Sequence, residues 1–495
     1  MSAFRALCFS LIALVLAACE QPAADALRFA LQSAPINLDP RYAADAASTR
    51  INRLLYTQLV ELDERGLPVP ALADWQLLAD RHYRLILRPD QSGRVFHDGT
   101  SLNSDDVKAT YDSVLFGQVP SLHRETLKNV LRVDVLNEHT VDFHLKHADP
   151  FFPALLTVGI LPKSLIETAH PFNTQPLGSG GFQLEAWPQT GRLQLRRRHD
   201  NQLFEFVTVP DPTVRVLKLL SGEVDMLQND LPVELVRYLA AQDDVLLTQY
   251  EGTGFTYIGF NLEDAVTGQQ SLRRAIAHAI DREAIIEHLF GGAARLANQI
   301  LPATHWAGEP DLAFYPYQPE RARQLMASLG YDQHKPLPII YKTSADPFRL
   351  RIATIVQQQL REVGIDMQLQ SYDWGTYFAD IKAGRFQMYS LMWVGVNTPD
   401  IFRNVFHSKA QPPQGANRGR FHDVKVDEQL EAAASATTLA AQAQHYRNVQ
   451  KRVHEQLPYV PLWYEDHIVA VRKDIHGYHL AADGNYDGLI EVYRQ

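Results

Sequence analysis

The segment from residue 336 to residue 393 carries the pattern that most constrains how this chain can fold. Three apolar strand candidates alternate there with two amphipathic helix candidates. The strands are predicted over 336–343, 365–372 and 386–393, and the helices over 346–363 and 374–384. This order is typical of a parallel α/β sheet, whose ligands bind beyond the carboxyl ends of the strands. The sequence therefore predicts an α/β fold with a ligand site near residues 343–346 and 393–397.

The length and charge of the chain limit its organisation and its partners. At 495 residues it exceeds what one hydrophobic core usually supports, so two or three lobes are expected. The formal net charge is −10, and the densest basic run, residues 192–199, alternates with Leu193 and Leu195 as a half-buried strand does. A solvated sheet face explains that run better than a nucleic-acid patch does. No nucleic-acid partner is therefore predicted.

The first nineteen residues predict an export signal that is not part of the fold. Arg5 precedes an apolar stretch, residues 6–16, that is too short to span a membrane stably. The following Leu-Ala-Ala-Cys19 resembles the bacterial lipobox, in which the peptide is cut before a cysteine that carries a diacylglycerol. The resemblance implies a signal peptide over 1–18 and a tether over 19–26 that is lipidated at Cys19. The lipid would anchor the protein to a membrane. The alternative is an ordinary secretory signal with an incidental cysteine.

The stretch VFHDGTSLNSDDVKATYDSVL, residues 95–115, looks chemical because acids, a histidine and hydroxyls crowd together in it. Each of these groups nevertheless has a structural interpretation. Ser104 is placed as a helix N-cap, and Asp105 and Asp106 fall in the first turn, where carboxylates suit the helix dipole. His97 belongs to the turn before that helix. We therefore predict scaffold here and not catalysis.

Motifs of common enzyme and metal-binding classes are missing from the sequence. It has no Gly-x-Ser-x-Gly, no glycine-rich phosphate loop followed by lysine, and no His-Glu-x-x-His. Its 19 histidines are scattered, with no paired cysteines and no recognisable cluster of histidine and carboxylate, so a structural zinc site is not expected. The prediction is a protein that is not an enzyme and uses no metal or cofactor.

Eight segments, in order along the mature chain, carry a resemblance to a known family. They are INLDPRYAADAAS, VFHDGTSLNSDDVKATYDSV, LGSGGFQL, LKLLSGEVDML, GFNLEDAVTGQQSLRRAIAHAIDREAII, YPYQPERARQLMASLGY, QQQLREVGIDMQLQSYDWGTYF and VPLWYEDHIVAVRKDIHGY. The sequence resembles the family 5 solute-binding proteins of ABC transporters, the peptide/nickel type. In that family the FHDGTSLNSDDV block is scaffold, which agrees with the interpretation from the residues.

The resemblance implies a two-lobed periplasmic-binding-protein fold with a hinge and an extra inserted N-terminal domain. Its map gives lobe I as 27–45, 165–258 and 468–495, the inserted domain as 46–164, and lobe II as 259–467. The implied protein is a monomer in the cell envelope, on the periplasmic side. It would bind a peptide-like or other small solute between the lobes and deliver it to ABC permease subunits. The alternative is an envelope binding module, a sensor or a peptide chaperone, without transport.

The resemblance also points to site residues. Trp393 matches a strand-ending tryptophan of the family, and Trp374 matches a cleft aromatic. In peptide-binding members an aspartate three residues after the strand-ending tryptophan holds the α-amino group of the peptide, but Val396 occupies that position here. The cleft is therefore expected to prefer an anionic or neutral group to a free amine. The expected ligand-binding residues are Ile36, Asn37, Ser344, Trp374, Trp393, Gly395, Val396, Asn397, Arg403 and Arg418; the alternative for the arginines is a place on the cleft rim.

Overall fold

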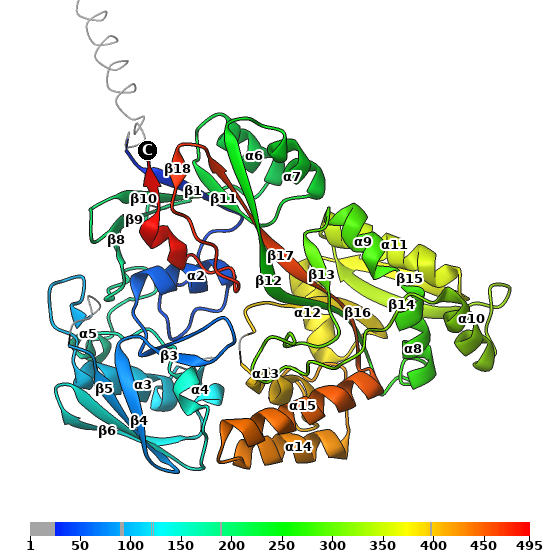
Figure 1. Ribbon diagram of the computed structural model, residues 1–495, viewed down its shortest axis with the longest axis horizontal. Coiled ribbons are helices and arrows are strands. Elements are labelled where there is room, and N and C mark those ends of the chain that lie inside the picture. Colours follow the sequence, from blue (N-terminus) through cyan, green and yellow to red (C-terminus); the bar gives the residue numbers. More distant parts are fainter. Residues whose placement is uncertain (1–24, 90–93, 120, 122, 189–190, 397) are drawn as a thin grey trace, which may run out of the picture.

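A computed structural model describes residues 25–89, 94–119, 121, 123–188, 191–396 and 398–495. Cys19, with the predicted signal peptide and most of the tether, lies outside this part of the chain, and so does Asn397. The described chain is α/β, as the sequence predicts. Figure 1 shows a large twisted sheet flanked by helices, with a separate helix and sheet layer at one end.

Eleven of the described strands form the large sheet. Ten lie in the spatial order β15, β14, β16, β12, β17, β11, β1, β10, β9, β8, and β13 pairs with β17. Their bounds are β1 Leu27–Leu31, β8 Phe182–Ala186, β9 Arg192–Arg197, β10 Leu203–Thr208, β11 Met226–Gln228, β12 Val245–Phe260, β13 Ala294–Leu296, β14 Leu337–Ser344, β15 Ile365–Tyr372, β16 Met388–Trp393 and β17 Tyr459–Arg472.

Two long antiparallel strands join the two halves of this sheet. Strands β12 and β17 pair from Val245↔Arg472 to Gly259↔Tyr459, with irregularities in register near Gly254 and Tyr257. They run together across the middle of the molecule, between the part that holds β8–β10 and the part that holds β14–β16 (Figure 1). The chain enters the β14–β16 half through β12 and leaves it through β17, so these two strands link the halves covalently.

The predicted alternation of strands and helices is confirmed in the β14–β16 half. Strand β14 pairs in parallel with both β15 and β16, and helix α11 (Pro347–Arg361) and helix α12 (Trp374–Ala383) make the connections. Asp346 caps α11 by accepting from the Arg349 N–H, and the helix buries Ile352, Ala353, Val356 and Leu360. Gly364 follows with a φ of +88°, the left-handed conformation that ends a helix cheaply only at glycine.

Further helices lie around the large sheet and between it and the separate layer (Figure 1). They are α2 Ala46–Leu55, α5 Lys163–Glu167, α6 Pro212–Leu220, α7 Val233–Ala240, α8 Gln270–Ala279, α9 Arg282–Leu289, α10 Pro319–Ser328, α13 Asp400–Phe406, α14 Val424–Ser435, α15 Leu439–Gln456 and the 3₁₀ segment η3 Asp487–Glu491. Two short pairs complete the set, β2 Val60–Leu62 with β3 Pro68–Pro70 and β18 Ile475–His476 with β19 Tyr493–Arg494.

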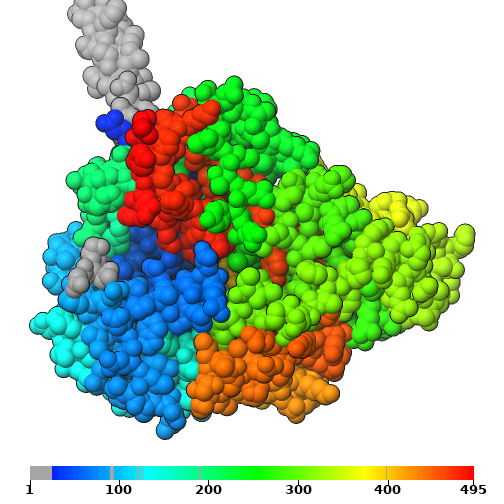
Figure 2. All heavy atoms as spheres, viewed as in Figure 1, coloured from blue at the N-terminus to red at the C-terminus, as the bar shows by residue number. Residues whose placement is uncertain are grey.

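A four-stranded antiparallel sheet with helix α3 (Ser104–Phe116) packed on it forms the separate layer. Its strands lie in the order β4, β5, β7, β6, and α4 and the 3₁₀ segment η2 lie nearby. The bounds are β4 Ala73–Ala79, β5 His82–Leu87, β6 Val130–Asn137, β7 Thr140–Leu145, α4 His123–Thr126 and η2 Phe152–Leu155. In the face seen in Figure 2, this blue and cyan layer lies against the orange helices α14 and α15. Phe151 packs on Trp306, with ring centroids 4.7 Å apart, and Trp306 in turn packs on Tyr446 of α15, with centroids 6.2 Å apart.

Asp98, Thr100, Asn103 and Asp106 make structural hydrogen bonds, whereas the buried Ser104 hydroxyl has no partner in the described structure, and the expected cap needs one correction. The N-cap of α3 is Asn103 and not Ser104: Asn103 Oδ1 accepts from the Asp105 N–H at 2.8 Å, and Asp106 Oδ2 accepts from the Asn103 N–H at 2.9 Å. This capping box satisfies N–H groups that Ser104, already the first helical residue, cannot reach. His97 Nδ1 accepts from the Gly178 N–H at 3.3 Å, and its burial lowers the pKa of the imidazole to about 4.

Candidate functional site

The carboxyl ends of the parallel strands meet where the sequence predicts a ligand site. Strand β14 ends at Ser344 opposite Tyr372 of β15, and Trp374 begins the next helix. Trp374 is 60% exposed, which is unusual for so large an apolar side chain. Trp393, at the end of β16, is half-buried, and the exposed Val394 and Gly395 follow it. This edge of the sheet therefore presents apolar surface to its surroundings.

Aromatic side chains from four elements form a row with one arginine in it, which we call the aromatic row. Trp374 stacks on Phe378 one turn later in α12, with centroids 5.5 Å apart and planes 8° apart. At the other end Tyr257 of β12 stacks on Tyr459 of β17 at 3.9 Å. Trp393 lies almost parallel to Tyr257 at 6.4 Å. In order the row is Trp374, Phe378, Arg418, Trp393, Tyr257 and Tyr459.

Arg418 occupies the middle of the aromatic row. Its guanidinium carbon lies 4.7 Å from the ring centroid of Trp393 and 5.2 Å from that of Phe378. Both distances are within the range of attractive cation–π contacts. Its Nη1 donates to the Tyr257 hydroxyl at a long 3.5 Å. No carboxylate pairs with Arg418 among the residues that the structure describes.

The aromatic row contains three residues that the sequence interpretation missed. Phe378 could have been found, because it lies four residues after Trp374 and an i, i+4 pair shares one face of a helix. Tyr257 and Tyr459 carry no such signal, since strands β12 and β17 meet only through the pairing of segments about two hundred residues apart in the chain. Only the fold brings these two rings next to Trp393.

Several predicted site residues have other partners and do not join the aromatic row. Arg403 Nη1 pairs with Glu431 Oε1 at 3.1 Å, and its Nη2 donates to the Leu430 carbonyl at 3.0 Å, so it ties α13 to α14. In the other half of the molecule, the N–H groups of Ile36 and Asn37 both donate to Ser48 Oγ, at 2.8 and 3.0 Å. Ile36 itself is 75% exposed and remains available as an apolar contact.

The position expected to hold a peptide amine contributes no charge. Val396 is half-buried and packs against the large apolar core that also contains Phe402 and Phe406. Asp400, the next acid along the chain, begins α13; burial, and then the charge of Asp149, raise the pKa of its carboxyl to about 6, while Arg403 works in the opposite direction. The protonation of Asp400 is therefore governed by the contact between α13 and the segment around Asp149.

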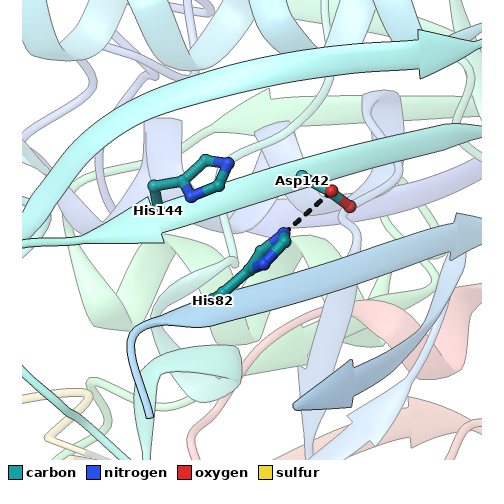
Figure 3. Close-up of side chains that lie close together, drawn as sticks. All are labelled: His82, Asp142 and His144. Atoms are coloured by element: carbon teal, nitrogen blue, oxygen red, sulfur yellow. Dashed lines mark hydrogen bonds and ion pairs between the residues drawn. The ribbon is translucent and has the colours of Figure 1, made fainter. Parts of the chain in front are cut away.

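A cluster of histidine and carboxylate, which the sequence interpretation did not foresee, lies on the outer face of the four-stranded sheet (Figure 3). His82 Nε2 lies 2.8 Å from Asp142 Oδ2, and the rings of His82 and His144 stack at 4.3 Å. Cross-strand pairing of His82 with His144 places them there, which the spacing along either strand does not reveal.

The side chains of this cluster are of types that bind metals, but its carboxylate is already paired with cationic side chains. Arg84 binds both oxygens of Asp142, at 2.8 and 2.9 Å. Arg132 Nε and His144 Nε2 both contact Oδ2 of Asp134, at 2.7 and 3.1 Å. Two guanidinium groups beside the carboxylates oppose a divalent cation, because each would repel it at short range. We interpret the cluster as a network of charged hydrogen bonds.

The sequence and the fold both match a known family. The model of the bacterial extracellular solute-binding proteins, family 5, matches residues 68–412, which is more than half of the chain. The chain belongs to this family. Its members bind solutes outside the cytoplasm, and the match covers the four-stranded sheet, β14–β16, Trp374 and Trp393. Fold class and family are therefore both as the sequence predicts.

Relatives of this family 5 protein cover almost its whole length. The dipeptide-binding protein of Escherichia coli (strain K12) is 24% identical, over 95% of this chain and 94% of its own. The fold is similar to that of NikA from Brucella suis in complex with Fe(III)-EDTA, with a TM-score of 0.85, 21% identity and coverage of 96% and 100%. AppA from Bacillus subtilis in complex with a nonapeptide has a TM-score of 0.80, 23% identity and coverage of 95% and 98%. These neighbours share the two-lobed periplasmic-binding-protein fold.

In the described part of the chain, no helix is long and apolar enough to span a bilayer.

Proposed function

We propose that this family 5 protein is the substrate-binding component of an ABC importer, which captures a peptide-like or other small solute and delivers it to permease subunits. The observation that carries the proposal is the aromatic row at the strand ends of the β14–β16 half. Rigid aromatic rings with one precisely placed polar group are typical of small-molecule sites. The row has no paired acid and base and no activated nucleophile, so we propose binding without catalysis.

We propose that the lobes are 27–45 with 165–258 and 468–495 (lobe I), and 259–467 (lobe II), with 46–164 inserted. Strands β12 and β17, which connect the two halves of the sheet, would then be the hinge. Bending two strands near their register irregularities needs few contacts to change. The solute would be enclosed between Ile36 and Asn37 on lobe I and Ser344, Gly395, Asn397 and the aromatic row on lobe II. We also propose that the protein acts as a monomer.

Native mass spectrometry of the mature protein, purified without denaturation, tests solute capture. A retained solute should appear as an excess mass that unfolding releases and that can then be identified. Re-addition of that solute to refolded protein should reduce the radius of gyration measured by small-angle scattering. It should also stabilise the fold by about 2.7 kcal/mol at a hundredfold excess over Kd. A saturated complex with an unchanged radius would contradict closure of the lobes.

We propose that Cys19 carries a lipid that holds the protein at the periplasmic side of the cell envelope. The lipobox-like Leu-Ala-Ala-Cys sequence supports this proposal. The substitution Cys19→Ser should move the protein from the membrane fraction to the soluble fraction. A wild-type protein that is already soluble and unacylated would contradict the proposal and favour an ordinary secretory signal.

A further inference from the structure

Arg418 differs in its partners from three other buried or half-buried arginines of the β14–β16 half. Arg273 and Arg282 each donate to at least two backbone carbonyls, and Arg349 pairs with both oxygens of Glu465. Arg418 has only the 3.5 Å contact with the Tyr257 hydroxyl. A guanidinium carries five N–H donors, so most of those on Arg418 have no acceptor in the described structure.

The neighbours of Arg418 supply no negative charge. Burial raises the pKa of Tyr389 and of Tyr459, so both hydroxyls are neutral at physiological pH. The rings of Trp393 and Phe378 attract the cation through their faces but accept no N–H in the plane of the guanidinium. A half-buried cation without a counter-ion keeps a desolvation cost that an incoming anion can offset.

The geometry also limits how an anion can approach. Two rings contact the guanidinium through their faces, which restrains its N–H edge before any ligand arrives. A planar carboxylate matches that edge with two parallel N–H···O bonds. An ammonium group would be repelled, and Val396 offers it no compensating charge.

We propose that Arg418, within the aromatic row, is the residue that recognises a carboxylate group of the bound solute. This inference rests on the proposed function as a solute-binding protein and specifies which end of a peptide-like ligand the β14–β16 half binds. It also separates the two arginines that the sequence could not tell apart. Arg403 is excluded because Glu431 and the Leu430 carbonyl already take its donors.

A matched peptide pool tests the assignment. Randomised N-acetylated tripeptides, as free acids and as the same pool with C-terminal amides, are equilibrated by dialysis against wild-type protein, and the bound peptides are counted by mass spectrometry. The wild type should enrich acids over amides by at least about tenfold, the effect of one or two charge-assisted hydrogen bonds. Arg418→Gln should lower the enrichment of acids by about ten- to hundredfold and leave that of amides unchanged.

Two variants make the result specific. Arg403→Gln is the control for a nearby lost charge and should enrich acids as the wild type does. Arg418→Lys keeps the charge without the planar fork, so it should lie between the wild type and Arg418→Gln, and it remains informative if Arg418→Gln folds poorly. Equal binding of acids and amides by the wild type, or loss of acid binding in Arg403→Gln alone, would overturn the inference and leave solute binding intact. A wild type that binds neither pool would overturn the proposed peptide-like ligand, and this inference with it.

Discussion

The aromatic row and the outer face of the four-stranded sheet both contain charged groups, but only on the sheet are those groups paired with opposite charges. On the sheet, Asp142 and Asp134 each bind one arginine and one histidine, so each negative charge is matched by donors on the same strand or a neighbouring one. In the aromatic row, Arg418 has rings beside it and no acid. A network whose charges are paired within the protein stabilises the fold. An unpaired charge at the ends of strands is instead available to bind a ligand.

This comparison predicts that removing a charge destabilises the protein strongly on the sheet and very little in the aromatic row. Asp142→Ala should destabilise the protein by about 2 to 3 kcal/mol, because it leaves Arg84 and His82 without their shared, buried acceptor. Arg418→Gln should change the free energy of unfolding by less than about 0.5 kcal/mol, because the two cation–π contacts and the long hydrogen bond that it removes are offset by relief of the desolvation cost of the cation. Urea unfolding measures both.

The exposed pair Glu234–Arg351 is the matched control for loss of an ion pair. Its partners are 57% and 50% exposed, so Glu234→Gln should cost less than about 0.5 kcal/mol. An Asp142→Ala variant as stable as Glu234→Gln would show that the outer-face network does not support the fold.

The next prediction concerns the effect of acid on His97, a buried side chain that is hydrogen-bonded within the protein. Its pKa is about 4 in the folded protein and about 6.5 when unfolded, so the unfolded state binds the proton first. The associated stability is complete above pH 6.5 and is lost as the pH falls toward 4. At pH 5 the loss should be about 1 to 2 kcal/mol after allowance for partial exposure. Denaturant unfolding at pH 7.5 and pH 5 should therefore show a smaller acid loss for His97→Gln than for wild type; equal losses would contradict this role.

The smallest expected effect concerns metal ions at His82, Asp142 and His144. If Arg84 and Arg132 already neutralise the carboxylates, 100 µM Zn²⁺, a concentration on the order of a hundredfold above a micromolar Kd, should leave Tm unchanged. A rise in Tm that His82→Ala abolishes would mean that the cluster binds metal, and would erase the distinction between the two regions.

How far the sequence predicts this protein depends on the range of the contacts involved. The β14–β16 alternation follows from local periodicity, so its strands and helices are close to their predicted bounds. The cap of α3 was misplaced by one residue because Asn103 and Ser104 are both good N-caps, and only the reciprocal bond with Asp106 decides between them. The His82–His144 stack and the Tyr257–Tyr459 stack depend on pairing between strands that lie far apart in the sequence. The periodicity of a single segment does not reveal such pairing.

The candidate site was predicted in part for the same reason. Trp374 closely follows the predicted strand 365–372 and Trp393 ends the predicted strand 386–393, so topology alone places them at one edge of the sheet. Arg418 lies outside helices and strands, and the sequence could not tell it from Arg403. The structure separates the two through their partners, an acid for Arg403 and aromatic rings for Arg418.

The central claim is that this site favours an anionic group over a free amine, and calorimetric titration of one tripeptide in two forms tests it most directly. The peptide is chosen from those that the wild type enriches, and it is titrated with a free and with an acetylated N-terminus. Because Val396 offers no counter-charge and Arg418 is cationic, the acetylated form should bind more tightly, by about tenfold or more. Tighter binding of the free-amine form would contradict the account and would mean that another acid, with Asp400 the first to test, holds the amine.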